Sequence, residues 1–380
     1  MERVVVVGAS AAGSTTAQTL RREGFTGAIT VIGDEPHLPY DRPPLSKQVL
    51  LGTWPVERTS FGASTTYAEQ GIDLRLGVRA AGLDLGRRVV ELSTGEEVGW
   101  DHLVVATGVQ PVRLSAGHHL DGVHVLRTLD DAVALRKSLV DAESVVVVGA
   151  GFLGSETAAA ARRLGCEVTL VDAAPAPMAV QLGAELGWMI SELHAANGVR
   201  VVGGTAVTGL LGESAVEGVE LADGSVVKAD AVLVAVGSRP ATNWLEASGL
   251  PCRDGVLCDE APAGVHAAGD VARWTSQRFG TSLRLEHRFN ATEQAVHAAR
   301  RILGQEVVFD PVPYFWTDQY DARIQVYGVI APDARLVVVQ GDPAARKFLA
   351  HYVSDGRVTA VLGWNLPRQL RAERALLTAI

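Results

Sequence analysis

The sequence predicts an α/β fold built on two parallel sheets, because two glycine-rich turns each follow a run of β-branched residues. In the second turn, residues 145–156 read VVVVGAGFLGSE, so Gly149, Gly151 and Gly154 complete the spacing G-x-G-x-x-G. The first glycine of such a turn permits a tight bend, the second lets a pyrophosphate approach the backbone, and the third lets helix and strand pack closely. The N-terminus of the following helix attracts the phosphates.

The residues after this turn continue the pattern of a dinucleotide-binding unit. Phe152–Leu164 is predicted to be a helix capped by Gly165, and Val168–Val171 is predicted to be the next strand. Asp172 closes that strand about twenty residues beyond the glycines, where an acidic residue binds a ribose. Because a carboxylate there repels a 2′-phosphate, the sequence favours NADH over NADPH.

The N-terminal residues repeat this arrangement. A strand at Val4–Val7 leads into Gly8–Gly13, which reads GASAAG and has Ser10 where the middle glycine would be. The helix, strand and acid that follow are predicted up to about Arg22, at Ile29–Ile32 and at Asp34. Two such units predict two bound dinucleotides. The alternative for the first unit is an incidental turn of small residues.

Further elements follow from hydrophobic periodicity and turn residues. They are buried strands at 103–108 and 232–237, a helix from a capping box at Thr128 and Asp131 to about Leu139, a β-meander over 199–230, a helix at 286–303, strands at 324–329, 336–340 and 347–353, and a basic helix from Arg368 to the end. The predicted fold class is therefore α/β, with two Rossmann-like dinucleotide-binding domains, one inserted in the other, plus a C-terminal α+β domain.

Composition excludes several classes of function. The net charge of −9 argues against a general nucleic-acid surface, and no apolar run reaches the roughly 20 residues that span a bilayer. The three cysteines form no C-x-x-C pair, so we expect no disulfide framework, and the histidines lack metal-ligand spacing. The chain begins in a strand without a signal peptide, so we expect a cytoplasmic location, with no membrane or metal involved.

Several motifs occur in a characteristic order: GASAAG, YDRPPLSK, ATG, GAGFLGSE, HAAGD, RLEH and FWTDQY. In this order the chain resembles the FAD-dependent, NADH-using ferredoxin reductases that serve cytochrome P450s and Rieske-type aromatic-ring dioxygenases, within the glutathione-reductase-like flavoprotein superfamily. The resemblance covers nearly the whole chain. The segments RPPLSK and WTDQY are the specific ones, since the glycine turns alone indicate only the superfamily.

The resemblance implies how the chain is divided and which residues bind FAD. The FAD-binding domain would comprise residues 1–110 and 237–311, the NADH-binding domain 111–236, and the C-terminal interface domain 312–380. The residues that would bind or line the FAD site are Gly8, Ala12, Gly13, Asp34, Arg42, Lys47, Ala80, Thr107, Arg127, Gly237, Asp270 and Arg288. Arg288 departs from the apolar or Trp residue usual at its position, and it would either pair with the anionic reduced flavin or point to solvent.

The resemblance also implies an NADH site and a catalytic group. Gly149, Gly151, Gly154 and Asp172 would bind NADH. Glu156 would lie near the nicotinamide and pair with Lys47 beside the flavin, and Trp316 would place its ring over the approach to the flavin. The alternatives are an exposed carboxylate at a helix N-terminus for Glu156, solvated charges on a surface turn for Lys47, and ordinary packing for Trp316.

The expected reaction is flavoprotein electron transfer, in which NADH reduces FAD and a [2Fe–2S] ferredoxin accepts single electrons. Candidates for a basic patch that meets an acidic ferredoxin are Arg42, Arg273, Arg278, Arg284 and Arg288, and scattered solubilising arginines are the alternative.

We expect a monomer or weak homodimer. The competing functions are an NADH oxidase or a quinone or dye reductase, and an NADH-sensing flavoprotein. Disulfide reductase chemistry is disfavoured because the first cysteine is Cys166.

Overall fold

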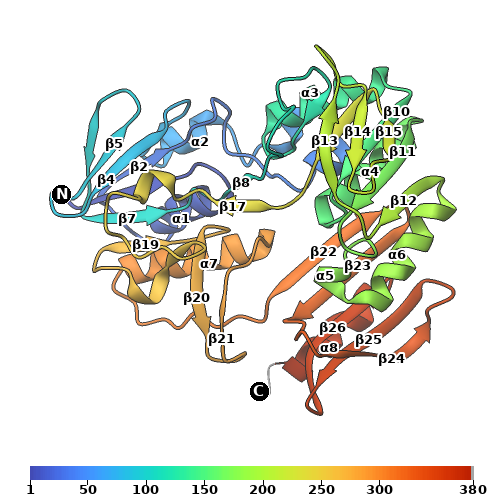
Figure 1. Ribbon diagram of the computed structural model, residues 1–380. Coiled ribbons are helices and arrows are strands. Elements are labelled where there is room, and N and C mark those ends of the chain that lie inside the picture. The colour runs from blue at the N-terminus through green and yellow to red at the C-terminus, as the bar shows by residue number, and fades with distance from the viewer. Residues whose placement is uncertain (378–380) are drawn as a thin grey trace. The chain divides into compact units, whose positions relative to one another are not determined.

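Two sets of chain segments form separate units in the computed structural model, which describes residues 1–377 (Figure 1). Unit 1 comprises Met1–Asp41, Thr59–Gln110 and Arg239–Phe315. Unit 2 comprises Arg42–Arg58, Pro111–Ser238 and the C-terminal segment that begins at Trp316. This grouping assigns residues 42–58 to the same unit as the second glycine-rich turn. The division into three domains at the predicted boundaries stays a prediction.

Unit 1 is built on a five-stranded parallel sheet in the order β19-β7-β1-β2-β3. Its strands are β1 (Arg3–Val7), β2 (Ala28–Ile32), β3 (Ile72–Arg75), β7 (His102–Val105) and β19 (Val265–Ala267). Four consecutive valines of β1 are buried, as expected for a strand covered on both faces. The helices of the unit are α1 (Ala11–Arg22), α2 (Ser64–Glu69) and α7 (Arg288–Ile302), and α1 packs against α7 (Figure 1).

Two small sheets complete unit 1. One contains β4 (Ala80–Asp84), β5 (Val89–Leu92) and β6 (Glu97–Gly99), and the other contains β18 (Val256–Leu257), β20 (Ala272–Ser276) and β21 (Thr281–Leu283). The short strands β8 (Val109–Pro111) and β17 (Ser238–Pro240) pair with each other. The short strands predicted over residues 72–98 and the helix predicted over 286–303 are confirmed, the latter as α7 with His287 as its N-cap.

Unit 2 repeats the same architecture in a second parallel sheet, in the order β12-β11-β10-β16-β9. Its strands are β9 (Val123–His124), β10 (Ser144–Val148), β11 (Glu167–Asp172), β12 (Val199–Gly203) and β16 (Ala231–Val234). Its helices are α3 (Leu129–Asp141), α4 (Phe152–Leu164), α5 (Ala179–Leu182) and α6 (Ala184–Ala196). The predicted capping box is present at the start of α3, and Gly165 caps α4 at a φ of +104°.

The β-meander predicted over 199–230 is only partly correct. Its first strand, β12, pairs in parallel with β11 and belongs to the main sheet. The meander proper consists of β13 (Val207–Leu211), β14 (Gly218–Leu221) and β15 (Val226–Lys228). A parallel strand and a hairpin strand of five residues look alike locally, because only the strand partner distinguishes them.

The C-terminal residues form a five-stranded sheet in the order β22-β23-β26-β25-β24 and a short helix. These elements are β22 (Tyr314–Gln319), β23 (Ala322–Gly328), β24 (Arg335–Asp342), β25 (Lys347–Ser354), β26 (Arg357–Trp364) and α8 (Pro367–Glu373). The sequence did not predict β22 or β26. The single basic helix expected from Arg368 to the end is wrong, because α8 ends at Glu373 and a 3₁₀ turn, Arg374–Leu377, follows; residues 378–380 lie outside the described residues. Among residues 1–377, no helix is long and apolar enough to cross a membrane.

Candidate functional site

The first glycine-rich turn connects β1 to α1 in unit 1. Gly8 has a φ of +118°, and a β-carbon there would lie 2.1 Å from the carbonyl oxygen of Ala106, just beyond the neighbouring strand β7. A β-carbon on Gly13 would lie 1.7 Å from the carbonyl oxygen of Gly8. The backbone itself therefore requires glycine at both positions.

The second turn, between β10 and α4 in unit 2, has the same geometry. Gly149 has a φ of +97°, and a β-carbon there would lie 2.3 Å from the carbonyl oxygen of Ala235. A β-carbon on Gly154 would lie 1.8 Å from the carbonyl oxygen of Gly149. The two turns thus meet the same two constraints at the carboxyl ends of equivalent strands, which is where α/β sheets bind ligands.

The middle position of the second turn is open. A β-carbon on Gly151 would meet only the side-chain amide nitrogen of Gln181, at an ordinary distance of 3.5 Å. The equivalent residue in the first turn, Ser10, is the N-cap of α1 and makes no side-chain capping bond. The second turn therefore leaves room for a ligand over a helix N-terminus, and at both turns the free backbone N–H groups of that end favour phosphate. This cradle fits the pyrophosphate of a dinucleotide.

Asp172 joins the end of β11 to the second turn. Its Oδ1 accepts a hydrogen bond from the backbone N–H of Ala174 at 2.7 Å, and its Oδ2 accepts one from the backbone N–H of Ala150. Asp172 is thus positioned at the glycines, as the sequence predicted. A carboxylate has about four acceptor sites, so two bonds leave capacity for the hydroxyls of a ribose.

The acid predicted for the first turn, Asp34, is exposed just after β2. Its neighbour Glu35 is engaged differently, since Glu35 Oε2 accepts a hydrogen bond from the hydroxyl of Tyr40 at 2.5 Å. The predicted role of Asp34 toward a ribose stays a prediction.

Asp270 and Ala12 lie near each other in unit 1. A β-carbon on Gly269, the residue before Asp270, would lie 3.1 Å from the β-carbon of Ala12, and the N–H of Gly269 donates to Gln294 Oε1 at 2.8 Å. The HAAGD segment therefore packs against the first turn, as a shared cofactor site requires.

The structure does not test the predicted FAD-binding roles of Ala80 and Thr107, which stay predictions. Ala80 begins β4 and is buried. Thr107 follows β7, and its hydroxyl donates to the carbonyl oxygen of Ala241 at 2.9 Å.

Arg288 does not point to solvent, so this alternative is wrong. Its Nε donates to Asp41 Oδ1, and its Nη1 donates to Thr292 Oγ1 at 2.5 Å. The guanidinium also lies over the ring of Phe61, 5.2 Å from the ring centroid. Arg288 is therefore fixed by three groups of unit 1, and its contact with a flavin stays a prediction.

Three arginines of the proposed basic patch pair with carboxylates, namely Arg273, Arg284 and, through Asp41, Arg288. Arg273 and Arg284 lie 2.8 and 3.1 Å from Asp254, and Arg284 lies 2.9 Å from Glu286. Their charges are therefore balanced locally, which weakens the argument for a patch that attracts an acidic partner.

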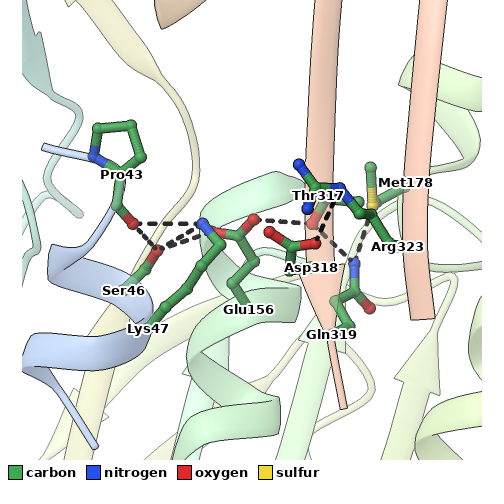
Figure 2. A network of polar contacts seen from close by, with 9 residues as sticks. All are labelled: Pro43, Ser46, Lys47, Glu156, Met178, Thr317, Asp318, Gln319 and Arg323. Atoms are coloured by element: carbon green, nitrogen blue, oxygen red, sulfur yellow. Dashed lines mark hydrogen bonds and ion pairs between the residues drawn. The ribbon is translucent and has the colours of Figure 1, made fainter. Parts of the chain in front are cut away.

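Lys47 and Glu156 form the predicted pair within unit 2 (Figure 2). Lys47 lies in a π-helical turn, Leu45–Val49, and its Nζ is 2.6 Å from Glu156 Oε2. The side chains are 14% and 7% exposed, so the alternatives of a solvated lysine and an exposed carboxylate are both wrong. Such a buried pair persists only where further hydrogen bonds satisfy it.

Two residues that the sequence did not single out supply those bonds. Ser46 donates from Oγ to Glu156 Oε2 at 2.7 Å, and Thr317 on β22 donates from Oγ1 to Glu156 Oε1 at 2.8 Å. Thr317 has no chemical signal of its own in the sequence, whereas its neighbour Trp316 carries a large ring. Strand alternation would have revealed Thr317, since in β22 residues 317 and 319 are buried while 316 and 318 are half-buried. The role of Trp316 stays a prediction.

Arg42 and Arg127 also come together in unit 2, since Arg42 Nη1 donates to the carbonyl oxygen of Arg127. The N–H of Arg127 in turn donates to Asp131 Oδ2 at 2.9 Å, next to the capping box of α3. Gly237, at a φ of +111°, accepts a hydrogen bond from the N–H of Val112 at 2.9 Å. These contacts fix the three residues without testing their predicted roles toward FAD.

Comparison with known families gives two matches that together span most of the chain. The model described as pyridine nucleotide-disulphide oxidoreductase matches residues 2–300. The model described as reductase C-terminal matches residues 314–379.

Individual relatives are similar over nearly their whole length. The ferredoxin–NAD(+) reductase subunit of the benzene 1,2-dioxygenase system of Pseudomonas putida is 36% identical over 381 residues, covering 99% of this chain and 92% of that protein. The crystal structure of a covalent putidaredoxin reductase–putidaredoxin complex matches with a TM-score of 0.95 and 31% identity, covering 100% of this chain and 93% of the other. The ferredoxin reductase for the CYP199A2 system of Rhodopseudomonas palustris matches with a TM-score of 0.91 and 35% identity, covering 96% and 91% of the two chains.

Proposed function

The chain belongs to the pyridine nucleotide-disulphide oxidoreductase family, and we propose that it is an FAD-containing ferredoxin–NAD(+) reductase that passes electrons from NADH to a [2Fe–2S] ferredoxin. The observation that carries this proposal is the pair of glycine-rich turns with matching backbone constraints, at Gly8 and Gly13 and at Gly149 and Gly154. Two such cradles suit an enzyme that holds two dinucleotides at once. The ferredoxin would serve an oxygenase of the P450 or Rieske type, as in the relatives.

The turn in unit 1 would bind FAD. The N-terminus of α1 would face the pyrophosphate, Asp34 would accept hydrogen bonds from the ribose, and Asp270 would bind the chain between ring and phosphate. When bound, FAD accepts a hydride from NADH and releases electrons one at a time, so it joins a two-electron donor to a one-electron acceptor.

The turn in unit 2 would bind NADH. Gly151 leaves space for the pyrophosphate, and Asp172 retains acceptor capacity for the ribose hydroxyls while its negative charge repels a 2′-phosphate. Glu156 lies two residues after Gly154 in α4, so the same helix that binds phosphate also carries the carboxylate of the buried pair.

Lys47 would supply a fixed positive charge to the reaction. Its ammonium donates to Glu156 Oε2, to the carbonyl oxygen of Pro43 at 3.3 Å and to Ser46 Oγ at 3.4 Å. A cation held in place before the reaction stabilises developing negative charge without reorganisation. We assign this role to Lys47.

The cysteines do not fit the disulfide chemistry that the family name includes. Cys166 is the first cysteine of the chain, and Cys166, Cys252 and Cys258 are free thiols. Burial raises the pKa of the Cys166 thiol and raises the pKa of Cys258 to about 12, so neither is activated as a thiolate.

The test is a steady-state assay under anaerobic conditions. NADH and cytochrome c are held constant while a [2Fe–2S] ferredoxin is added, with putidaredoxin as the first probe and rhodocoxin and a Rieske-system ferredoxin alongside. We expect the rate of cytochrome c reduction to rise with at least one ferredoxin and to saturate. A rate independent of all three would instead favour a reductase of small acceptors.

A further inference from the structure

The hydrogen bonds around Glu156 continue beyond Thr317 (Figure 2). Gln319 lies two residues further along β22 on the same buried side, and its side chain is 1% exposed. Its Nε2 donates to Thr317 Oγ1 and to the sulfur of Met178, both at 3.3 Å. Both hydrogens of this amide group are therefore used within unit 2.

Glu156, Thr317 and Gln319 thus form a row of hydrogen-bonded side chains. The next member of this row is His194 on α6, whose side chain is fully buried. Its Nε2 lies 3.0 Å from Gln319 Oε1, and its Nδ1 lies 3.2 Å from the hydroxyl of Tyr320. Burial lowers the pKa of His194 to about 4, so the ring is neutral at neutral pH and carries one N–H.

The chemistry of each group fixes the direction of every bond in the row. Gln319 Oε1 can only accept, so the proton of His194 is on Nε2, and Nδ1 accepts from the hydroxyl of Tyr320. Thr317 Oγ1 already accepts from Gln319, and its single proton therefore goes to Glu156 Oε1. Every donor thus points along the row toward Glu156.

The row orients groups and does not carry protons. A carboxamide does not pass a proton from its oxygen to its nitrogen under ordinary conditions, so Gln319 interrupts any relay from His194 to Thr317. What His194 does supply is a donor for the carboxamide oxygen, which distinguishes the two ends of an otherwise nearly symmetric group.

We propose that His194 is a positioning residue of this reductase, which locks the carboxamide of Gln319 in one orientation and so commits the hydroxyl proton of Thr317 to the carboxylate that pairs with Lys47. The kinetic consequence rests on the proposed function, because it assumes that Lys47 and Glu156 act in the reaction with NADH. The geometric consequence concerns unit 2 alone.

Loss of the His194 donor has a specific effect. The carboxamide of Gln319 can then flip, so that its oxygen faces Thr317. That oxygen attracts the hydroxyl proton of Thr317 away from Glu156. Glu156 keeps Ser46 and Lys47 but loses its only bond on Oε1 among those the structure shows. The carboxylate is then free to rotate, and Lys47 is no longer held in a single position.

The test compares His194→Phe, Thr317→Val and the double variant in the holoenzyme. His194→Phe keeps a ring of similar size but no donor, whereas His194→Gln places an amide N–H near the original Nε2 and should rescue. The signal of the Lys47 ammonium in ¹⁵N-lysine-labelled protein, assigned by its loss in Lys47→Met, reports the pair directly. Stopped-flow reduction by NADH reports the chemistry.

We expect both single variants to shift or broaden the Lys47 signal and to slow reduction by about tenfold, the equivalent of one hydrogen bond to a charged group. The double variant should be no worse than either single one, because both act on the same bond. His194→Gln should stay within about twofold of the wild type. His124→Phe is the matched control, since His124 is a half-buried histidine of unit 2 that bonds Ser138 at 2.8 Å outside the row.

An unchanged Lys47 signal in His194→Phe, or effects of the two single variants that multiply in the double variant, would overturn the inference. Different results would contradict the proposed function. NADH would then reduce the flavin of Lys47→Met at the wild-type rate, or the ferredoxin would not accept electrons. Neither result depends on the ammonium signal.

Discussion

Glu156 is the residue on which the polar chemistry of unit 2 converges. It accepts hydrogen bonds from Ser46, Lys47 and Thr317, which come from two segments far from it in the sequence. A buried carboxylate that accepts hydrogen bonds from three donors is held in one orientation. The pair with Lys47 is thus a fixed part of the site.

Removing the charge of Glu156 should therefore destabilise the protein strongly. Glu156→Gln leaves the Lys47 ammonium buried without a counter-charge, and we expect the free energy of unfolding to fall by about 3 kcal/mol in urea titrations. Lys47→Met combined with Glu156→Gln should cost less than Glu156→Gln alone.

The control is Glu97→Gln. Glu97 lies at the same distance of 2.6 Å from Arg87, but both side chains are largely exposed, so solvent screens the pair and no measurable loss of stability is expected. An equal loss in both variants would show that burial does not determine the strength of the Lys47–Glu156 pair.

Asp172 should determine the choice of coenzyme. Asp172→Ala removes the charge that repels a 2′-phosphate, so we expect the ratio of kcat/KM for NADH to that for NADPH to fall by about tenfold or more. Asp172→Asn, which keeps one acceptor for the N–H of Ala150 or Ala174, should relax the ratio with less loss of NADH affinity. A wild-type enzyme that prefers NADPH would contradict this assignment.

The residue scale also shows where sequence reasoning reaches its limit. The pairing of Lys47 with Glu156 crosses 109 positions and was predictable only through the motifs that the family shares. Ser46 and Thr317 lay inside those motifs, but neither residue type carries a chemical signal of its own. Their roles depend on a single shared partner, which only the fold supplies.

At the scale of elements, the two glycine-rich turns are the best-determined features. Helix α4 has the predicted bounds because Gly151 and Gly165 mark its two ends, one as N-cap and one as left-handed C-cap. By contrast, β26, whose last five residues are all buried, was not predicted. Strand β12 was misassigned because its partner, β11, is remote in sequence.

The turns predict different outcomes for two glycines with similar backbone angles. Gly149→Ala places a β-carbon against the carbonyl oxygen of Ala235, whereas Gly165→Ala meets no atom within 4 Å, although both residues have positive φ. We expect Gly165→Ala to cost about 1 kcal/mol of stability and Gly149→Ala about 3 kcal/mol or more. NADH affinity, measured by fluorescence titration, should fall only in Gly149→Ala. Equal effects would mean that the close approach at Gly149 is not required.

At the scale of the whole molecule, three histidines with lowered pKa values, the buried His194 and the half-buried His266 and His287, should make stability depend on pH. Burial lowers the pKa of His194, His266 and His287 to about 4, whereas an unfolded histidine titrates near 6.5. The unfolded chain therefore binds more protons between these values, so stability is complete above about pH 6.5 and is lost as the pH falls toward 4.

Thermal unfolding between pH 7 and pH 4.5 checks this prediction. We expect the Tm to fall by more than about 5 °C across the interval, and by less in His194→Gln, which lacks one of the titrating groups. A Tm that stays constant down to pH 4.5 would show that these rings are not held neutral in the folded protein.

Both units follow one plan, a five-stranded parallel sheet with a glycine-rich turn after its central strand, and this repeat was visible in the sequence. The plan accounts for two dinucleotides, and the comparisons connect it with reductases that act on ferredoxins. The central claim is therefore that electrons enter as a pair from NADH and leave singly to a protein acceptor.

A single-turnover experiment tests that claim most directly. The holoenzyme is reduced with one equivalent of NADH under anaerobic conditions and mixed in a stopped-flow instrument with excess oxidised [2Fe–2S] ferredoxin, chosen as the most active in the steady-state assay. We expect about two ferredoxins to be reduced for each NADH consumed, while the flavin is reoxidised at the same rate. Flavin that stays reduced until oxygen or a quinone is added, with no ferredoxin reduced, would contradict it.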